Sequence, residues 1–239
     1  MLKLAQEDLK RWLVALQTQP TQTHELLPWI EGALHDFFPF KRIFNAHSEL
    51  IAGQIKTTHW LASGHDDLYL HQLSTTFDLE HRGSMQWWFQ SREPFTIDPN
   101  NPPLFTSDFE LAEIKKFEMQ TVAVHGVLNS RSSGGTYFSF AEVPTPLSGW
   151  HIEASRLLAP VQNVLFLSYI AKQSSDSSQM LRGLTHRQKD IVRHVAEGKD
   201  DKSVKRTLGI SEKTVRNQLS DIYSLLGISK RTQLLPLLG

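Results

Sequence analysis

The chain has 239 residues, of which 40% are hydrophobic and 21% charged, a composition typical of a globular protein with one large or two smaller domains. It contains no cysteine, which excludes disulfide bonds, thiolate metal sites and cysteine nucleophiles. No apolar run reaches the ~18 residues needed to span a bilayer, and the charged N-terminal segment does not resemble a signal peptide. We therefore expect a cytoplasmic protein with no membrane partner.

The formal net charge of zero is unevenly distributed. Residues 181–239 hold 12 Lys and Arg against 6 Asp and Glu, whereas residues 1–180 hold 13 against 19. A basic segment attached to an acidic body is typical of a DNA-binding part, because neutralising phosphates supplies much of the affinity for DNA. The Ser-rich stretch 172–180 lacks apolar periodicity and predicts a linker. We therefore predict a domain over 1–171, a linker over 172–180 and a second domain over 181–239.

The first domain is predicted to mix helices and strands. In chain order we expect helices over 4–17 and 23–38, strands over 42–48 and 51–61, a helix over 79–90, a strand over 94–97, a helix over 109–117, strands over 121–128 and 136–143, and a long helix over 151–171. This order predicts an α+β domain with a mostly antiparallel sheet flanked by helices. The helix His151–Ala171 is apolar over most of its circumference, so it is a candidate dimer contact. Burial within its own domain is the alternative.

The second domain is predicted to be all-α, with four short helices. Thr185, Asp200, Ser211 and Ser229 are candidate N-caps. The second and third helices are joined by a tight turn ending at Ser211. Such a helix-turn-helix unit places its second helix in the major groove of DNA.

The third of these helices has two distinct faces. At about 100° per residue, one face collects Val215, Leu219, Ile222 and Leu226 and is expected in the core. The opposite side carries Lys213, Arg216, Asn217, Ser220 and Ser224. Arginine can read guanine and asparagine can read adenine, so Arg216 and Asn217 are candidate base contacts. Lys213, Ser211 and Thr214, at the helix start, are placed for phosphate. A solvated surface face is the alternative interpretation.

Several short motifs lie between residues 184 and 235: Leu184-Thr185, Ala196-Glu197-Gly198, Leu208-Gly209-Ile210-Ser211, Thr214-Val215 and Leu226-Gly227. Together they resemble the LuxR-type (GerE-like) helix-turn-helix domain. The resemblance implies base contacts from Arg216, Asn217 and Ser220, and phosphate contacts from Lys202, Lys213, Thr214 and Arg231. The chain departs from the family pattern at Gln188, Lys205, Gln218 and Leu225. Its DNA preference therefore cannot be copied from the family.

The run His125–Val143 resembles the strand-loop-strand near the end of autoinducer-binding domains, with Gly126 at the glycine typical of that family. This resemblance implies a GAF-like α-β-α sandwich. The acyl-homoserine-lactone signature is not met, because Gly64 stands four residues after Trp60 and Asp98-Pro99 lies too late. The overall pattern is similar to EpsA-like regulators, which implies exopolysaccharide regulation but no particular ligand.

Aromatic residues are plentiful in the first domain and suit an apolar small-molecule pocket, although plain core packing is the alternative. The candidate pocket residues are Trp60, Tyr69, Trp87, Trp88, Gly126 and Phe138. The 11 histidines show no metal-ligand spacing, so we expect no metal site. Since no catalytic or cofactor motif is present, we expect no cofactor and no enzyme.

The sequence thus predicts a transcription regulator that binds a palindromic operator in double-stranded DNA as a homodimer. Two versions remain open. In one, a small ligand in the first domain shifts the dimer toward DNA binding. In the other, that domain is a ligand-free dimerisation scaffold. A small-molecule enzyme fused to a DNA-binding domain is the alternative from another class.

Overall fold

The structure is a computed structural model that describes residues 4–73, 76–131, 133–228, 231 and 234. The chain divides into two compact units, Met1–Tyr169 and Ile170–Gly239. Within the described residues, no helix combines the length and apolar character needed to cross a membrane.

The first unit is built on one six-stranded sheet in which every neighbouring pair is antiparallel, in the order β3-β2-β1-β6-β5-β4. The strands are β1 (Arg42–Ile51), β2 (Gln54–Ser63), β3 (Thr76–Asp78), β4 (Phe95–Ile97), β5 (Val122–Leu128) and β6 (Gly134–Ala141). β1 and β6 occupy the centre, although one comes from the start of the domain and the other from its end. The prediction of a mostly antiparallel sheet is confirmed.

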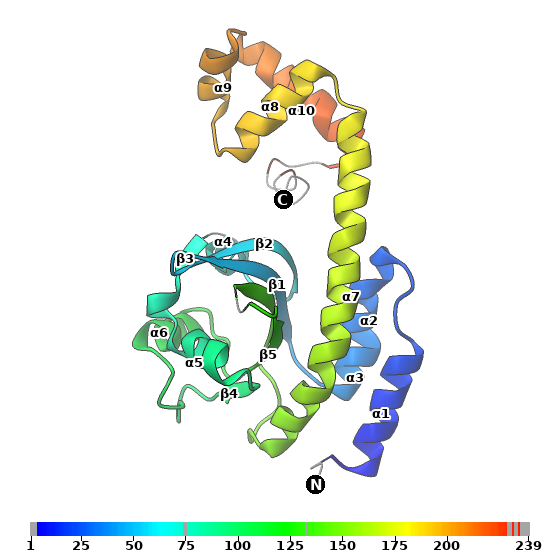
Figure 1. The fold of residues 1–239 in the computed structure, drawn as a ribbon, viewed down its shortest axis with the longest axis vertical. Coiled ribbons are helices and arrows are strands. Elements are labelled where there is room, and N and C mark those ends of the chain that lie inside the picture. The colour runs from blue at the N-terminus through cyan, green and yellow to red at the C-terminus, as the bar shows by residue number, and fades with distance from the viewer. Residues whose placement is uncertain (1–3, 74–75, 132, 229–230, 232–233, 235–239) are drawn as a thin grey trace. The chain divides into compact units, whose positions relative to one another are not determined.

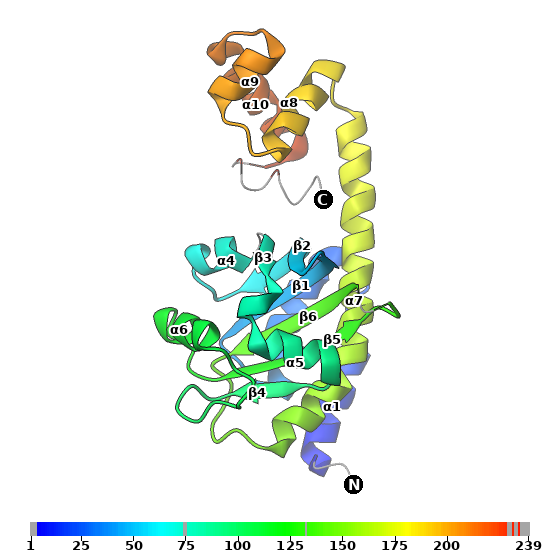
Figure 2. The ribbon, with the colours of Figure 1, turned by 60° about the vertical axis from the view of Figure 1, so that its left-hand side comes forward.

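Helices cover both faces of this sheet (Figures 1 and 2). One face carries α1 (Gln6–Gln17), the continuous helical run η1 (Thr23–Glu25), α2 (Leu26–Trp29), η2 (Ile30–Leu34) and α3 (His35–Phe37), and the N-terminal part of α7 (Gly149–Arg182). The other face carries α4 (Asp67–Leu73), η3 (Leu79–His81), α5 (Gly83–Ser91) and α6 (Asp108–Lys116). The expected α-β-α sandwich is therefore confirmed.

Because helices cover both faces of the sheet, the side chains of one strand pack against helices on both sides. Successive residues of a strand point to opposite faces. In β6, Phe138 and Phe140 therefore face α7 and its neighbours, whereas Tyr137 faces α5. Both sets are buried or half-buried because both faces carry helices. Burial alone thus does not distinguish the two faces of this sheet.

Four elements differ from the sequence-based expectation. β1 continues to Ile51, so the turn to β2 is made by Ala52 and Gly53, both at positive φ. The short elements α4 and β3 were not predicted. The stretch 172–180, predicted as a linker, lies inside α7. No proline or glycine occurs from residue 161 to residue 182, so nothing in the chain ends the helix there.

The second unit contains three described helices beyond the end of α7: α8 (His186–Ala196), α9 (Asp201–Leu208) and α10 (Glu212–Leu226). Their apolar faces meet in one core formed by Leu184, Ile191, Val192, Val195, Val204, Val215, Leu219, Ile222, Leu226 and Leu234. The predicted core face of the third helix is confirmed. The predicted fourth helix lies outside the described residues, apart from Arg231 and Leu234.

Candidate functional site

The helix-turn-helix is held by capping residues at each break. Asp200 caps α9 by accepting from the Ser203 N–H at 2.9 Å. Gly209 ends α9 in the left-handed region, at φ 63°, where a glycine avoids the penalty that a Cβ would bring. Two residues later the Ser211 hydroxyl accepts from the Thr214 N–H at 3.0 Å and starts α10. The chain therefore reverses between the two helices within three residues.

The outer face of α10 is polar and open to solvent. Lys213, Arg216, Asn217 and Ser220 are all exposed, opposite the buried stripe. The structure thus brings the candidate base-contacting residues together on one face. Ser211 and Thr214 lie at its N-terminal end, with their hydroxyl oxygens 2.8 Å apart. Lys202 is exposed on α9.

Two of the candidate DNA-contacting cations already have acidic partners. The Arg216 guanidinium forms an ion pair with Glu212, one helical turn earlier, and its Nε lies 3.8 Å from Oδ2 of Asp201. Nη1 of Arg231 lies 2.8 Å from Oδ1 of the same Asp201, and its other amino group donates to the Lys199 carbonyl. Asp201 therefore lies between two cations that the sequence analysis assigns to DNA.

Two departures from the family pattern have a structural explanation. Gln188 completes a capping box with Thr185: its side-chain oxygen accepts from the Thr185 N–H at 2.9 Å, which a glutamine does as well as a glutamate. Lys205 is exposed on α9, so its long side chain does not enter the helix–helix contact. Gln218 is half-buried, and Leu225 is exposed.

The first unit contains a cavity of about 50 Å³ between the sheet and the helices α4, α5 and α6. Its apolar lining is Phe44, Ala46, Leu73, Phe77 and Met85, and its hydroxyl lining is Ser48, Thr57, Tyr69, Tyr137 and Ser139. Burial raises the pKa values of Tyr69 and Tyr137, so both phenols stay protonated and available as donors. A cavity of this volume has room for a few water molecules.

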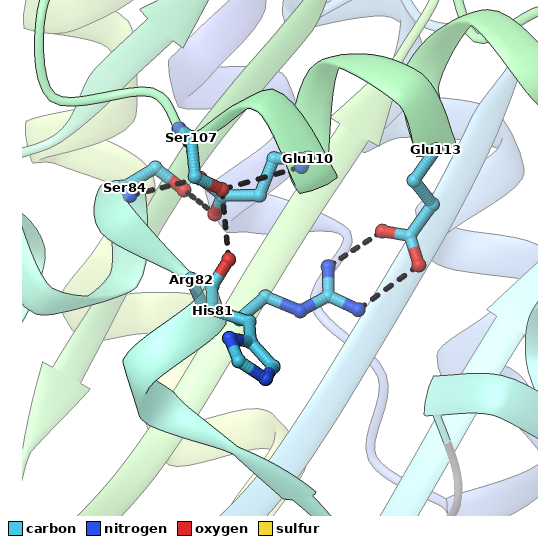
Figure 3. Close-up of polar contacts among 6 residues, drawn as sticks. All are labelled: His81, Arg82, Ser84, Ser107, Glu110 and Glu113. Carbon is cyan, nitrogen blue, oxygen red and sulfur yellow. Dashed lines mark hydrogen bonds and ion pairs between the residues drawn. The ribbon is translucent and has the colours of Figure 1, made fainter.

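Arg82 and Glu110, which line the cavity, belong to a buried ionic cluster. Figure 3 shows the polar contacts of this cluster. Arg82 makes two hydrogen bonds to the carboxylate of Glu113, at 2.5 and 2.9 Å, and its guanidinium lies 5.0 Å from the ring centroid of Phe77. Glu110 accepts from the backbone N–H groups of Ser84 and Ser107, at 3.1 and 3.0 Å, and from the Ser84 hydroxyl. Each charge is thus compensated inside the protein, by an opposite charge or by helix N-terminal N–H groups.

The structure brings together only part of the predicted pocket. Tyr69 lines the cavity, and Trp60 and Trp88 pack in the same hydrophobic cluster. Trp87 packs against this cluster too but does not line the cavity, and its ring stacks on Phe105 with centroids 4.5 Å apart.

Two further predicted pocket residues have other roles. A Cβ at Gly126 would lie 2.3 Å from the Thr136 carbonyl oxygen and 2.6 Å from the Trp88 ring, so the glycine permits close packing. Phe138 does not belong to the cavity. It lies on the opposite face of the sheet, where it packs on Phe166 of α7, because strand side chains alternate.

The sequence did not point to Arg82, Glu110 or Ser139 as cavity residues. Tyr137 and Ser139 alternate with Phe138 and Phe140, and this pattern could have placed them on a shared face. Arg82 and Glu110 lie outside the strands and 28 positions apart in the chain. Only the packing of α6 against the start of α5 brings them together.

A buried polar chain crosses the other face of the sheet. The Gln162 side chain donates to Oδ1 of Asn45 at 3.1 Å, so its own oxygen faces Nε2 of His125 at 2.9 Å. His125 Nε2 is therefore the protonated nitrogen, and Nδ1 is buried without a hydrogen-bond partner among the described residues. Burial lowers the pKa of His125 to about 3, which keeps it neutral near pH 7.

Within the described residues, no group of three or more His, Cys, Asp and Glu side chains is placed to hold a metal ion. The two candidate functional sites are the exposed polar face of α10 and the cavity of the first unit.

The family model of bacterial regulatory proteins of the luxR family, GerE, matches residues 182–238. Among curated relatives, an uncharacterized transcriptional regulatory protein of Bacillus subtilis, YhcZ, is 34% identical over 67 residues, 28% of this chain. A putative HTH-type transcriptional regulator of Mycobacterium tuberculosis is 32% identical over 71 residues, also 28% of this chain. The chain spans 31% of the length of the first relative and 8% of the second.

Solved structures resemble the chain more extensively but weakly. The match to Escherichia coli SdiA covers 95% of this chain and 94% of the SdiA chain, with 13% sequence identity and a TM-score of 0.43. CepR2 of Burkholderia cenocepacia, an N-acylhomoserine-lactone-dependent LuxR family transcription factor, covers 66% of this chain and 91% of its own at 18% identity and a TM-score of 0.46. A GAF domain from a Coxiella burnetii phosphotransferase covers 72% and 96% at 12% identity, also with a TM-score of 0.46.

The family match covers the segment in which the structure shows capped helices, a tight turn and an exposed polar face on α10. Residues 182–238 of this chain are therefore a helix-turn-helix domain of the LuxR (GerE) family of bacterial regulatory proteins.

Proposed function

We propose that the chain is a transcription regulator that binds double-stranded DNA through α10. The observation that carries this proposal is the exposed polar face of Lys213, Arg216, Asn217 and Ser220 within the LuxR-family domain. In this proposal Arg216, Asn217 and Ser220 contact base edges, and Lys202, Ser211, Lys213 and Thr214 contact phosphates. Its DNA partner implies that it acts in the cytoplasm.

In vitro selection from a random double-stranded library tests the proposal directly. The full chain should enrich one sequence motif, and the enriched DNA should bind at least about a thousandfold more tightly than random DNA. Failure to enrich any sequence at low salt would contradict the function. A motif with two inverted half-sites would support binding as a homodimer.

We infer that α7 contributes the dimer contact. Gln162 and Phe166 of α7 are buried against their own sheet. On the same helix Val164 is 61% exposed and Leu167 40% exposed, an apolar surface that a second copy would cover. A Val164→Glu variant should shift the chain from dimer to monomer in sedimentation velocity experiments. An unchanged dimer would place the contact elsewhere. Gln90→Glu controls for added charge, because Gln90 is exposed on α5, across the sheet from α7.

We further propose two versions of the role of the first unit: control by a small ligand in its cavity, or a dimerisation scaffold without a ligand. The hydroxyl lining and the protonated phenols support a ligand with hydrogen-bond acceptors. The small volume favours the second version, a ligand-free scaffold, because ligand pockets usually measure about 300–1,000 Å³. In the first version, lining side chains such as Met85 must move to admit a larger molecule.

Thermal-shift screening with small neutral molecules separates the two versions. A ligand at a hundred times its Kd stabilises the folded state by about 2.7 kcal/mol. Ser139→Leu should abolish the shift by filling the cavity, while an exposed substitution between β5 and β6, Ser130→Leu, should leave it unchanged. If no compound shifts the transition and the two variants regulate alike, the scaffold version holds. The link to exopolysaccharide genes stays a proposal that a genome-wide binding map would test.

A further inference from the structure

Three carboxylates gather where the two helices of the helix-turn-helix begin. A surface groove of about 460 Å³ is lined by Lys199, Asp200, Asp201, Lys202, Glu212 and Arg231, together with Gly198. It contains three cations and three carboxylates, although residues 181–239 as a whole carry twice as many cations as anions. Half of the six acidic residues in that segment therefore lie in this one groove.

The three carboxylates have different partners. Asp200 is engaged as the N-cap of α9. Glu212 pairs with Arg216 on its own helix. Asp201 differs, because it joins separate elements: its Oδ1 pairs with Arg231 at 2.8 Å, and its Oδ2 lies 3.8 Å from Nε of Arg216.

The position of Asp201 affects how Arg216 meets DNA. The Arg216 side chain is 67% exposed, and Asp201 and Glu212 are its carboxylate partners. To contact a base or a phosphate, the guanidinium must exchange at least one of these carboxylates for an acceptor on DNA. Guanine offers two acceptors in a bidentate arrangement that repays this exchange, whereas a wrong base does not. The negative charge of Asp201 also opposes close approach of any phosphate.

We propose that Asp201 is a specificity-determining residue that competes with DNA for Arg216 and Arg231 and so weakens binding to the motif more than binding to random DNA. On the motif Arg216 must leave Asp201 to reach a base, whereas on random DNA, which offers no matching acceptors, the pair persists. This inference rests on the proposed function, because it assumes that α10 reads DNA.

The test compares the full chain with the Asp201→Asn variant, which keeps the size of the side chain and removes its charge. Affinity is measured on the selected DNA motif and on random-sequence DNA across a range of salt concentrations. The variant should bind the motif about two- to fivefold more tightly, a gain typical of one exposed ion pair, and bind random DNA with a smaller gain. The ratio of specific to non-specific affinity should therefore rise. The salt dependence on random DNA should steepen by about 0.9, because one freed cation contacts a phosphate.

Asp190→Asn is the matched control. Asp190 lies on α8 and pairs with Arg193 at 2.8 Å, so this variant makes the same charge change without touching Arg216 or Arg231. It should leave the specificity ratio unchanged. In a double-mutant cycle, Asp201→Asn should no longer raise the ratio once Arg216 is replaced by alanine.

Several results would overturn the inference. An unchanged or lower specificity ratio in Asp201→Asn would do so, and so would an equal rise in Asp190→Asn. A rise that persists in the Arg216→Ala background would show that Asp201 does not act through Arg216. These results leave DNA binding by the unaltered chain intact and so differ from failure of the proposed function. If the unaltered chain selects no motif, both proposals fail together.

Discussion

The two units place their polar residues in opposite ways. In the C-terminal unit the candidate functional groups lie on the exposed face of α10, and the interior is apolar. In the N-terminal unit the most distinctive charges, Arg82, Glu110 and Glu113, are buried beside a cavity. A surface site tolerates substitution without loss of folding, whereas a buried ionic site is also part of the core. Substitutions at the site of the C-terminal unit should therefore change function without changing stability. Substitutions at the buried site of the N-terminal unit should change both.

The largest expected effect comes from breaking the buried ion pair between Arg82 and Glu113 in the N-terminal unit. Glu113→Gln leaves the Arg82 guanidinium buried without its carboxylate and should cost about 3–5 kcal/mol of unfolding free energy. Urea denaturation followed by tryptophan fluorescence measures this loss. Glu93→Gln is the control, because its ion pair with Arg156 is exposed and should contribute at most ~1 kcal/mol. Equal losses in the two variants would show that burial of the first pair does not matter.

The second effect concerns His125 and pH. Its pKa is about 3 in the folded chain and near 6.5 when unfolded, so only the unfolded state takes up the proton between these values. The stability it contributes is present above pH 6.5 and is lost as the pH falls toward 3. The loss at pH 5 amounts to about 2 kcal/mol relative to pH 7.

His125→Phe removes this titration and keeps a ring in the site. The variant should be less stable at pH 7, because Gln162 loses its hydrogen-bond donor, but its stability should fall less between pH 7 and pH 5. His65, whose pKa burial lowers to about 4, leaves a residual slope of the same sign. Identical pH slopes in urea titrations of the two proteins would contradict the assignment.

The third effect should change DNA binding without changing folding. Arg216→Ala should cost about 1–3 kcal/mol of affinity for the selected motif and relax the preference at one base position. Gel-shift titration and a repeated selection measure both quantities. The melting temperature should stay near that of the unaltered chain, because the side chain is exposed. If the affinity for the motif is unchanged, Arg216 does not belong to the face that recognises DNA.

The smallest effect should be uniform over DNA sequences. Lys202→Ala removes an exposed cation of α9 that is assigned to phosphate, so it should weaken all DNA about equally. The slope of log affinity against log salt should become shallower by about 0.9. If Lys202→Ala weakens binding to the motif alone, Lys202 contacts a base instead of a phosphate.

The sequence by itself determined most of the C-terminal unit. Capping residues, glycine stops and the 3.6-residue period are local, so Ser211, Gly209 and the stripe from Val215 to Leu226 could be assigned from neighbours in the chain. It also determined that the N-terminal unit mixes helices with an antiparallel sheet, because strand alternation and turn residues are local too.

Only the tertiary structure decided how distant residues meet. Both faces of the sheet are covered by helices, so apolar and polar residues alternate without revealing which face lines the cavity, and the candidate pocket residue Phe138 lies on the face opposite the cavity. Arg82 with Glu113, and Asp201 with Arg216 and Arg231, come from separate elements whose packing sets their distances. The stretch 172–180 shows the same limit, because a polar composition does not end a helix that meets no proline or glycine.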